Sequence, residues 1–236
     1  MNTPSTFFKR YELKYLLGPD QFRRLGEAMQ GRLQPDPYGP ATICSLYYDT
    51  PDRLLIRRSL EKPVYKEKLR LRSYGPPAPE STVFVELKKK YKGVVYKRRV
   101  AMPLGAAQSA LAGRRPLPGQ VGREIGWALT LYPAIAPAMA IAYDRTAWLG
   151  TDDHGLRITF DSHILWQDHP PTLGPCAGGN PLLAPGQRLM EVKFPDAMPL
   201  WLAHELDRLA IYPTSFAKYG GAYRAALQGK GAVSCA

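Results

Sequence analysis

Residues 63–74 read PVYKEKLRLRSY, and the interpretation of the whole chain begins with this stretch. Lys66, Lys68, Arg70 and Arg72 occupy every second position, and Leu69 and Leu71 fall between the last three of them. Because side chains alternate between the two faces of a β-strand, the stretch predicts a strand with one cationic and one apolar face. Cations that follow one another along one face repel, and only nearby carboxylates or a bound anion relieve that repulsion.

The same division into an ionic and an apolar face recurs along the chain. Strands are predicted over residues 7–17, 42–49, 54–60, 63–74, 82–90, 94–101, 138–149, 155–165 and 187–194. Helices are predicted over residues 19–32, 104–112, 119–131 and 197–211, and residues 166–186 are predicted to form a long loop. The further ionic faces carry Arg10, Glu12 and Lys14; Glu86, Lys88 and Lys90; Lys97 and Arg99; Arg157, Thr159 and Asp161; and Glu191 and Lys193.

Two arrangements of the strands would account for these ionic faces. They are either the solvated outer faces of a β-sandwich or the inner lining of a closed antiparallel barrel. Ordinary solvent faces balance the two signs of charge, whereas these are strongly cationic, and this favours the barrel. A cationic interior would bind a chain of phosphates, and Glu12, Glu86 and Glu191 could hold Mg²⁺ or Mn²⁺ there.

The composition is that of an ordinary globular protein with a large basic excess. The 236 residues carry a formal net charge of +12, so an anionic partner is expected: nucleic acid, an anionic membrane or a small polyanion. Three widely spaced cysteines indicate neither a disulfide framework nor a metal site. No signal peptide or membrane-spanning stretch is evident, which predicts a cytoplasmic protein. We expect one domain over residues 1–228 and a disordered tail over 229–236.

A series of motifs resembles a known family. RYELKY (10–15), YYDT (47–50), KLRLRSYG (68–75), VFVELK (83–88), KRR (97–99), YDRTA (143–147), LRITFD (156–161), MEVKFP (190–195) and FAKY (216–219) follow one another in the order of the VTC domain. That domain is the polyphosphate polymerase of the vacuolar transporter chaperone type, within the CYTH-like superfamily of triphosphate tunnel metalloenzymes. The resemblance extends from about residue 7 to residue 224.

The resemblance implies a mainly β (α+β) fold: a closed eight-stranded antiparallel tunnel with peripheral helices. It also implies transfer of the γ-phosphate of ATP to a growing polyphosphate chain, with Mn²⁺ or Mg²⁺ as cofactor. The catalytic residues would be Lys14, Arg70, Arg72, Lys88, Glu191 and Lys193. Phosphate would also contact Arg10, Lys68, Lys97, Arg99, Arg145, Arg157 and Lys218. Glu191 would be the main metal ligand, and Glu12 and Glu86 would bind metal or orient the basic side chains.

One position departs from the family pattern. The family usually has Ser before the lysine near the C-terminus, whereas Ala217 precedes Lys218 here. Ala217 favours one alternative to the polymerase, a sensor that binds polyphosphate or nucleotide without turnover. The resemblance itself leaves a second one open, a triphosphatase of the same superfamily. Nucleic acid is not expected as a partner, because the basic residues follow strand alternation rather than an exposed stripe. A membrane-protein partner would be needed for export, and the oligomeric state is not predicted.

Overall fold

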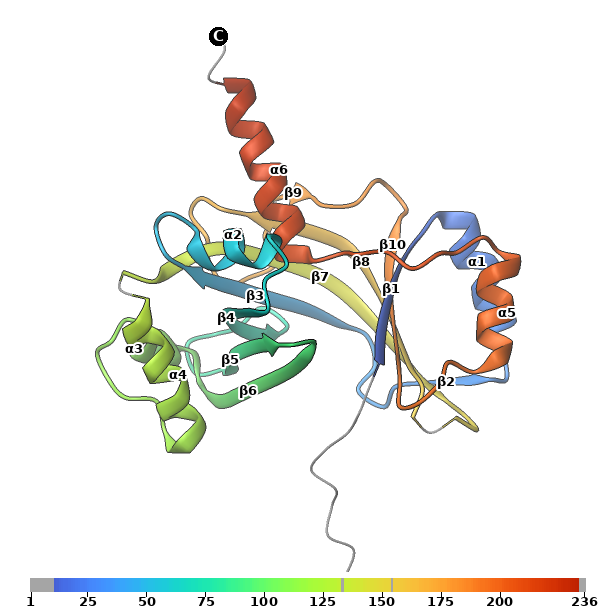
Figure 1. Ribbon diagram of the computed structural model, residues 1–236, viewed down its shortest axis with the longest axis horizontal. Coiled ribbons are helices and arrows are strands. Elements are labelled where there is room, and N and C mark those ends of the chain that lie inside the picture. The colour runs from blue at the N-terminus through green and yellow to red at the C-terminus, as the bar shows by residue number, and fades with distance from the viewer. Residues whose placement is uncertain (1–10, 133, 154, 234–236) are drawn as a thin grey trace, which may run out of the picture. The chain divides into compact units, whose positions relative to one another are not determined.

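The computed structural model describes residues 11–132, 134–153 and 155–233. Strands dominate: β1 (Tyr11–Leu17), β2 (Leu33–Pro35), β3 (Ala41–Asp49), β4 (Tyr65–Tyr74), β5 (Thr82–Tyr91), β6 (Val94–Pro103), β7 (Ala136–Gly150), β8 (Arg157–Gln167), β9 (Asn180–Pro181) and β10 (Arg188–Phe194). The helices are α1 (Pro19–Ala28), α2 (Leu54–Leu60), α3 (Leu104–Leu111), α4 (Gly119–Leu131), α5 (Leu200–Arg208) and α6 (Lys218–Val233) (Figure 1). Within the described ranges, no helix has both the length and the apolar character needed to cross a membrane.

The described residues form two compact units. Unit 1 contains those of Met1–Ala41, Asp144–His163 and Leu183–Phe216, and unit 2 contains those of Thr42–Tyr143, Ile164–Leu182 and Ala217–Ala236. In unit 1, β1 pairs with β10 and β10 pairs with β8, both antiparallel. Helices α1 and α5 pack beside each other in this unit, and Leu25, Leu202 and Leu206 join the apolar side chains of β10 in its core.

Unit 2 contains residues 63–74, the stretch that alternates between cationic and apolar side chains. Its strands follow the order β7-β3-β4-β5-β6, and β4 is antiparallel to both β3 and β5. Leu69, Leu71, Val83 and Val85 are buried on one face of this sheet, where α3 and α4 pack against it. The apolar face of residues 63–74 is therefore covered by helices, as the alternation predicted.

The expected eight-stranded, mainly antiparallel sheet is confirmed, but its closure is corrected. The strand order β1-β10-β8-β7-β3-β4-β5-β6 is a path with two ends, and among the described strands no pairing joins β1 to β6. Alternation specifies which face of a strand is buried, whereas closure depends on tilt and stagger, which alternation does not encode. Two short strands, β2 and β9, pair with β7 and β8 beside this path.

The predicted strand over residues 54–60 is wrong, since this segment is helix α2. Arg53, the residue before this helix, provides no side-chain cap. The missing acceptors come instead from Asp49, the last residue of β3, and from Thr50, which follows it. Thr50 Oγ1 accepts the Leu54 N–H, and the two carboxylate oxygens of Asp49 accept those of Leu55 and Ile56. Capping of the first turn in this way favours a helix over the extended conformation.

Helix α6 was not assigned from the sequence. It begins at Lys218, packs against α2 (Figure 1) and runs to Val233, which extends it into the segment from residue 229 onward that was expected to be disordered. The Asp49 carboxylate also accepts a hydrogen bond from the hydroxyl of Tyr219 at 2.8 Å. One buried carboxylate thus stabilises the start of α2 and fixes the first turn of α6.

Candidate functional site

Unit 2 presents a continuous cationic surface on strands β4, β5 and β6, which we call the cation face. Lys68, Lys88 and Lys97 lie directly opposite one another in register across the three strands. The next row along the strands places Arg70, Glu86 and Arg99 side by side. Cross-strand neighbours of like charge are destabilising, so the lysine row has an energetic cost that a bound anion would remove. Arg72 completes this face and is itself buried.

Glu86 is the carboxylate that three cations of this face share. It is only 1% exposed, and it accepts contacts of 2.6 to 2.8 Å from Arg70, Lys97 and Arg99. Burial alone would raise the pKa of Glu86, but the charges of Arg70 and Arg72 and the hydrogen bond from Lys97 outweigh burial and hold it well below its usual value. Glu86 is therefore ionised and fixes the directions of three cationic side chains.

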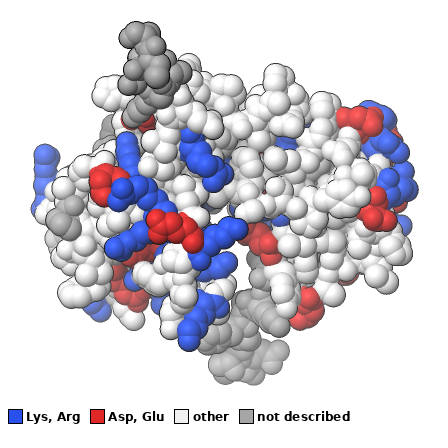
Figure 2. All heavy atoms as spheres, turned by 45° about the horizontal axis from the view of Figure 1, so that its top comes forward, with Lys and Arg blue, Asp and Glu red and all other residues white. Residues whose placement is uncertain are grey.

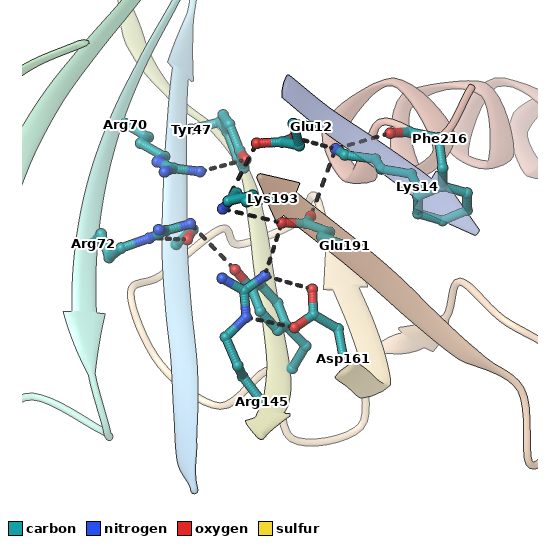
Figure 3. Close-up of polar contacts among 12 residues, drawn as sticks. Glu12, Lys14, Tyr47, Arg70, Arg72, Arg145, Asp161, Glu191, Lys193 and Phe216 are labelled. Atoms are coloured by element: carbon teal, nitrogen blue, oxygen red, sulfur yellow. Dashed lines mark hydrogen bonds and ion pairs between the residues drawn. The ribbon is translucent and has the colours of Figure 1, made fainter. Parts of the chain in front are cut away.

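Tyrosines hold the two arginines of β4. The Arg70 guanidinium donates to the Tyr47 hydroxyl at 3.2 Å (Figure 3), and that of Arg72 donates to the Tyr143 hydroxyl at 3.2 Å. Tyr47 is buried, which opposes its ionisation, but the charges of Arg70, Arg72 and Lys68 outweigh burial and lower its pKa to about 8. This direction of the shift shows how strongly positive the potential is at the cation face.

Lys218 reaches the same unit from the beginning of α6. Its Nζ lies 4.5 Å from the centre of the Tyr143 ring, a cation–π contact. The preceding residue, Ala217, supplies its carbonyl oxygen to the N–H of Gly221. Ala217, the residue that departs from the family pattern, therefore directly precedes helix α6. A serine at this position would add a hydroxyl donor beside Lys218.

Unit 1 carries a second group of charges, which we call the Glu191 cluster. Glu191 is mostly buried on β10, and Lys14, Lys193 and Arg145 point toward it from three strands at 3.4 to 3.7 Å (Figure 3). Glu12 lies 3.6 Å from both lysines. The Lys14 ammonium also donates to the Phe216 carbonyl at 3.2 Å. The Arg145–Glu191 contact is a long hydrogen bond of 3.4 Å, and the lysine contacts of the two glutamates are ion pairs of 3.6 to 3.7 Å, all longer than the contacts of Glu86.

Two further ion pairs fix arginines in unit 1. Asp161 is fully buried and accepts two hydrogen bonds from Arg145, at 2.6 and 2.7 Å. Arg157 lies 2.8 Å from the buried carboxylate of Asp36, the residue that directly follows β2. A bidentate pair of this kind holds the guanidinium rigidly and leaves its remaining donors in a defined direction.

The structure gathers the sequence-predicted residues into these two groups. The cation face contains Lys68, Arg70, Arg72, Glu86, Lys88, Lys97 and Arg99, with Lys218 in the same unit, and the Glu191 cluster contains Glu12, Lys14, Arg145, Glu191 and Lys193, with Arg157 in the same unit. Arg10 lies outside the described residues. Sequence reasoning missed Tyr47, Tyr143 and Asp36. It placed Asp161 on the ionic face of its strand without giving it a role.

A metal ion would need ligands beyond the protein. In the described part of the chain, no three His, Cys, Asp or Glu side chains come together in a way that could hold one. Glu12 and Glu191 are two oxygen donors of the kind that Mg²⁺ and Mn²⁺ prefer, and phosphate oxygens commonly complete such sites. Glu12 and Glu191 fit this role better than Glu86, whose oxygens are committed to three short contacts.

Comparison with known proteins identifies a family and a shared fold. The profile of the family named VTC domain matches residues 9–227. A candidate adenylate cyclase from Bacillus halodurans is 15% identical, with a TM-score of 0.53, 89% of this chain and 95% of that chain being covered. A candidate adenylyl cyclase from Hippeastrum, described as having a dominant triphosphatase activity, is 13% identical with a TM-score of 0.54, covering 91% of this chain and 95% of that one. No curated protein matches the sequence. At identities this low, the two structures show that the chain shares their fold.

Proposed function

The chain belongs to the VTC domain family, and from that premise we propose that it is an ATP-dependent polyphosphate polymerase. It would transfer the γ-phosphoryl group of ATP to the end of an inorganic polyphosphate chain, with ADP as the leaving group. The family and the fold support an enzyme that binds triphosphate or polyphosphate, and the polymerase reaction is the specific form that we propose. The expected location is the cytoplasm, where ATP is available.

The single observation that carries the proposal is the row of three lysines in register on the cation face. Lys68, Lys88 and Lys97 lie opposite one another, and Arg70 and Arg99 follow in the next row. Like charges in adjacent positions of a sheet are destabilising, and an anion bound across the three strands would offset that cost. An extended chain of phosphates offers charges at short, regular intervals, and it would neutralise several of these cations at once.

Phosphoryl transfer depends mainly on alignment and on charge stabilisation. The arginines of the cation face would bind phosphate oxygens in fixed directions, because Glu86 and the tyrosines already hold them. The lysines would act as point charges that follow the chain. The acceptor phosphate is already an anion, so the reaction needs no strong general base. The cationic side chains would stabilise the charge that develops on the transferred group.

Glu191 and Glu12 are the residues that would hold a divalent metal. A bound Mg²⁺ or Mn²⁺ would neutralise phosphate oxygens and orient them. Lys14 and Lys193 flank both carboxylates and would contact phosphate beside them. Arg145, which is fixed by Asp161, would provide a forked donor at the same place.

The test is to incubate the purified protein with ATP and Mn²⁺ and to resolve the phosphate products by chain length. We expect long polyphosphate and ADP, and we expect Glu191→Gln to lower the rate at least about 100-fold. Glu27→Gln is the matched control, since Glu27 is exposed on α1 and pairs there with Arg23, and it should retain activity within about twofold. Figure 2 shows, at its right-hand edge, basic and acidic side chains that lie side by side on the surface in this way.

Each of the other outcomes identifies a different function. Hydrolysis is the alternative, because the structural neighbour from Hippeastrum is described as a triphosphatase, and release of orthophosphate without any polymer would replace the polymerase proposal by this one. Tight binding of polyphosphate without ADP release would instead identify a sensor. Full activity of Glu191→Gln would contradict the role given to Glu191.

A further inference from the structure

One end of the cation face carries aromatic rings instead of lysines. Tyr74 is the last residue of β4, and Phe84 lies opposite Arg72 on β5. Both belong to the face that carries Arg70, Glu86 and Arg99, since their positions keep the same alternation. Tyr74 is 54% exposed although it stands beside a strongly polar surface. Phosphate binding alone gives this exposed ring at the end of the cation face no role.

The three side chains form one interacting group. The guanidinium carbon of Arg99 lies 4.2 Å from the centre of the Phe84 ring. The Tyr74 and Phe84 rings meet edge to face, with centroids 5.7 Å apart and an interplanar angle of 84°. Arg99 also donates to the Tyr74 hydroxyl at 3.4 Å and to Glu86 at 2.6 Å. The rings are therefore held in place by the residues that organise the cation face.

We propose that Tyr74, Phe84 and Arg99 form a binding site for the base of a nucleoside triphosphate whose phosphates extend along the cation face. This inference rests on the proposed function and adds the part of the substrate that the phosphates do not define. Aromatic rings and guanidinium groups are the side chains on which bases stack, and stacking tolerates any base because every base has a π-face.

The spacing of the face agrees with this arrangement. Residues two apart on a strand are separated by about 7 Å, so the Arg70–Glu86–Arg99 row lies about 7 Å from Phe84 and the lysine row about 13 Å from it. These separations are comparable with the distances from a base to the first and last phosphates of an extended nucleoside triphosphate. The base would lie against the rings, and the terminal phosphates would reach Lys88 and Lys97.

The experiment compares two ligands that share their phosphates and differ in the base. Dissociation constants for ATP and for inorganic tripolyphosphate are measured calorimetrically with the wild type and with Tyr74→Ala. We expect Tyr74→Ala to weaken ATP binding by about tenfold or more, as loss of a stacking ring does elsewhere, and to change tripolyphosphate binding by less than about twofold. Tyr74→Phe, which keeps the ring, should bind ATP nearly as the wild type does.

Tyr96→Ala is the matched control. Tyr96 is 43% exposed on β6 at a position that alternation places on the opposite face from Arg99. Its replacement should leave the binding of both ligands unchanged. Tyr74→Ala could instead weaken ATP and tripolyphosphate binding equally, or weaken neither. Either result would overturn the proposed base site but would not contradict the proposal that the cation face binds phosphates. If the wild type binds neither ligand, the proposed function fails, and this inference fails with it.

Discussion

At the scale of single residues, the carboxylates of the two units are held differently. Glu86 has three cationic neighbours within 2.8 Å, whereas the cations around Glu191 stay at 3.4 to 3.7 Å. Short, charge-assisted contacts fix a side chain, and longer ones leave its oxygens able to change partners. We infer that Glu86 organises the cation face and that Glu191 is the carboxylate suited to exchange a lysine for a metal ion.

The contacts of Glu86 lead to a prediction about stability and pH. Its pKa is lower in the folded protein than in the unfolded chain, so its contribution is present above the unfolded pKa of about 4.5 and is lost as the pH falls through the folded pKa. At pH 7, Glu86→Gln should lower the free energy of unfolding by about 2 kcal/mol, because three cations lose their shared partner and part of that loss is screened by solvent.

Urea unfolding at several pH values measures this effect. The difference between the wild type and Glu86→Gln should be largest near neutral pH and should shrink steadily below about pH 4.5. Glu80→Gln, at an exposed position between β4 and β5, should match the wild type throughout. A difference that is independent of pH would show that the amide acts through packing rather than through charge.

Alternation along each strand was sufficient to predict which side chains of that strand share its ionic face, including Glu86 with Lys88 and Glu191 with Lys193. It could not predict the partners. The contacts of Tyr47 with Arg70 and of Asp161 with Arg145 depend on cross-strand register, which one sequence does not reveal. In both cases a hydroxyl or carboxyl group on a neighbouring strand orients an arginine side chain.

At the scale of elements, the failure over residues 54–60 has a local cause. The segment LLIRRSL is apolar enough to form a strand, and its helical state depends on acceptors that precede it in the chain. Asp49 ends β3, receives two N–H groups of α2 and also accepts the Tyr219 hydroxyl. One residue at the end of a strand thus determines the conformation of one helix and the attachment of another.

Removing the Asp49 carboxylate should therefore destabilise unit 2. Asp49→Ala leaves two helix N–H groups and a buried hydroxyl without their acceptor, and we expect a loss of about 3 kcal/mol in the free energy of unfolding. The measurement is the midpoint of chemical unfolding. Asp52→Ala removes an exposed ion pair with Arg57 and the hydrogen bond from the Thr50 hydroxyl, but no acceptor of a helix N–H group, so it should cost only about 1 kcal/mol. Equal losses for both variants would refute the capping role.

At the scale of the whole molecule, the charged side chains behind the net charge of +12 are distributed unevenly. The exposed pairs of Arg23 with Asp20 and Glu27 on α1 balance locally. On the cation face, rows of Lys and Arg lie in register across β4, β5 and β6, with Glu86 among them. Net charge alone left nucleic acid, a membrane and a small polyanion open as partners, and it is the register of β4, β5 and β6 that favours a chain of phosphates.

This concentration of charge predicts a strong effect of salt on ligand binding. Raising the ionic strength from about 0.1 M to about 1 M shortens the screening length from about 10 Å to about 3 Å, which is less than the spacing between rows of the cation face. We expect tripolyphosphate affinity to fall by at least about tenfold over this range, because several half-exposed cations contribute and each is weakened. The measurement is a titration at each salt concentration, accompanied by urea unfolding to show that the protein stays folded. Affinity that does not change with salt would mean that the phosphates are bound by buried groups alone, and the exposed lysines Lys88 and Lys97 would then have no part in binding.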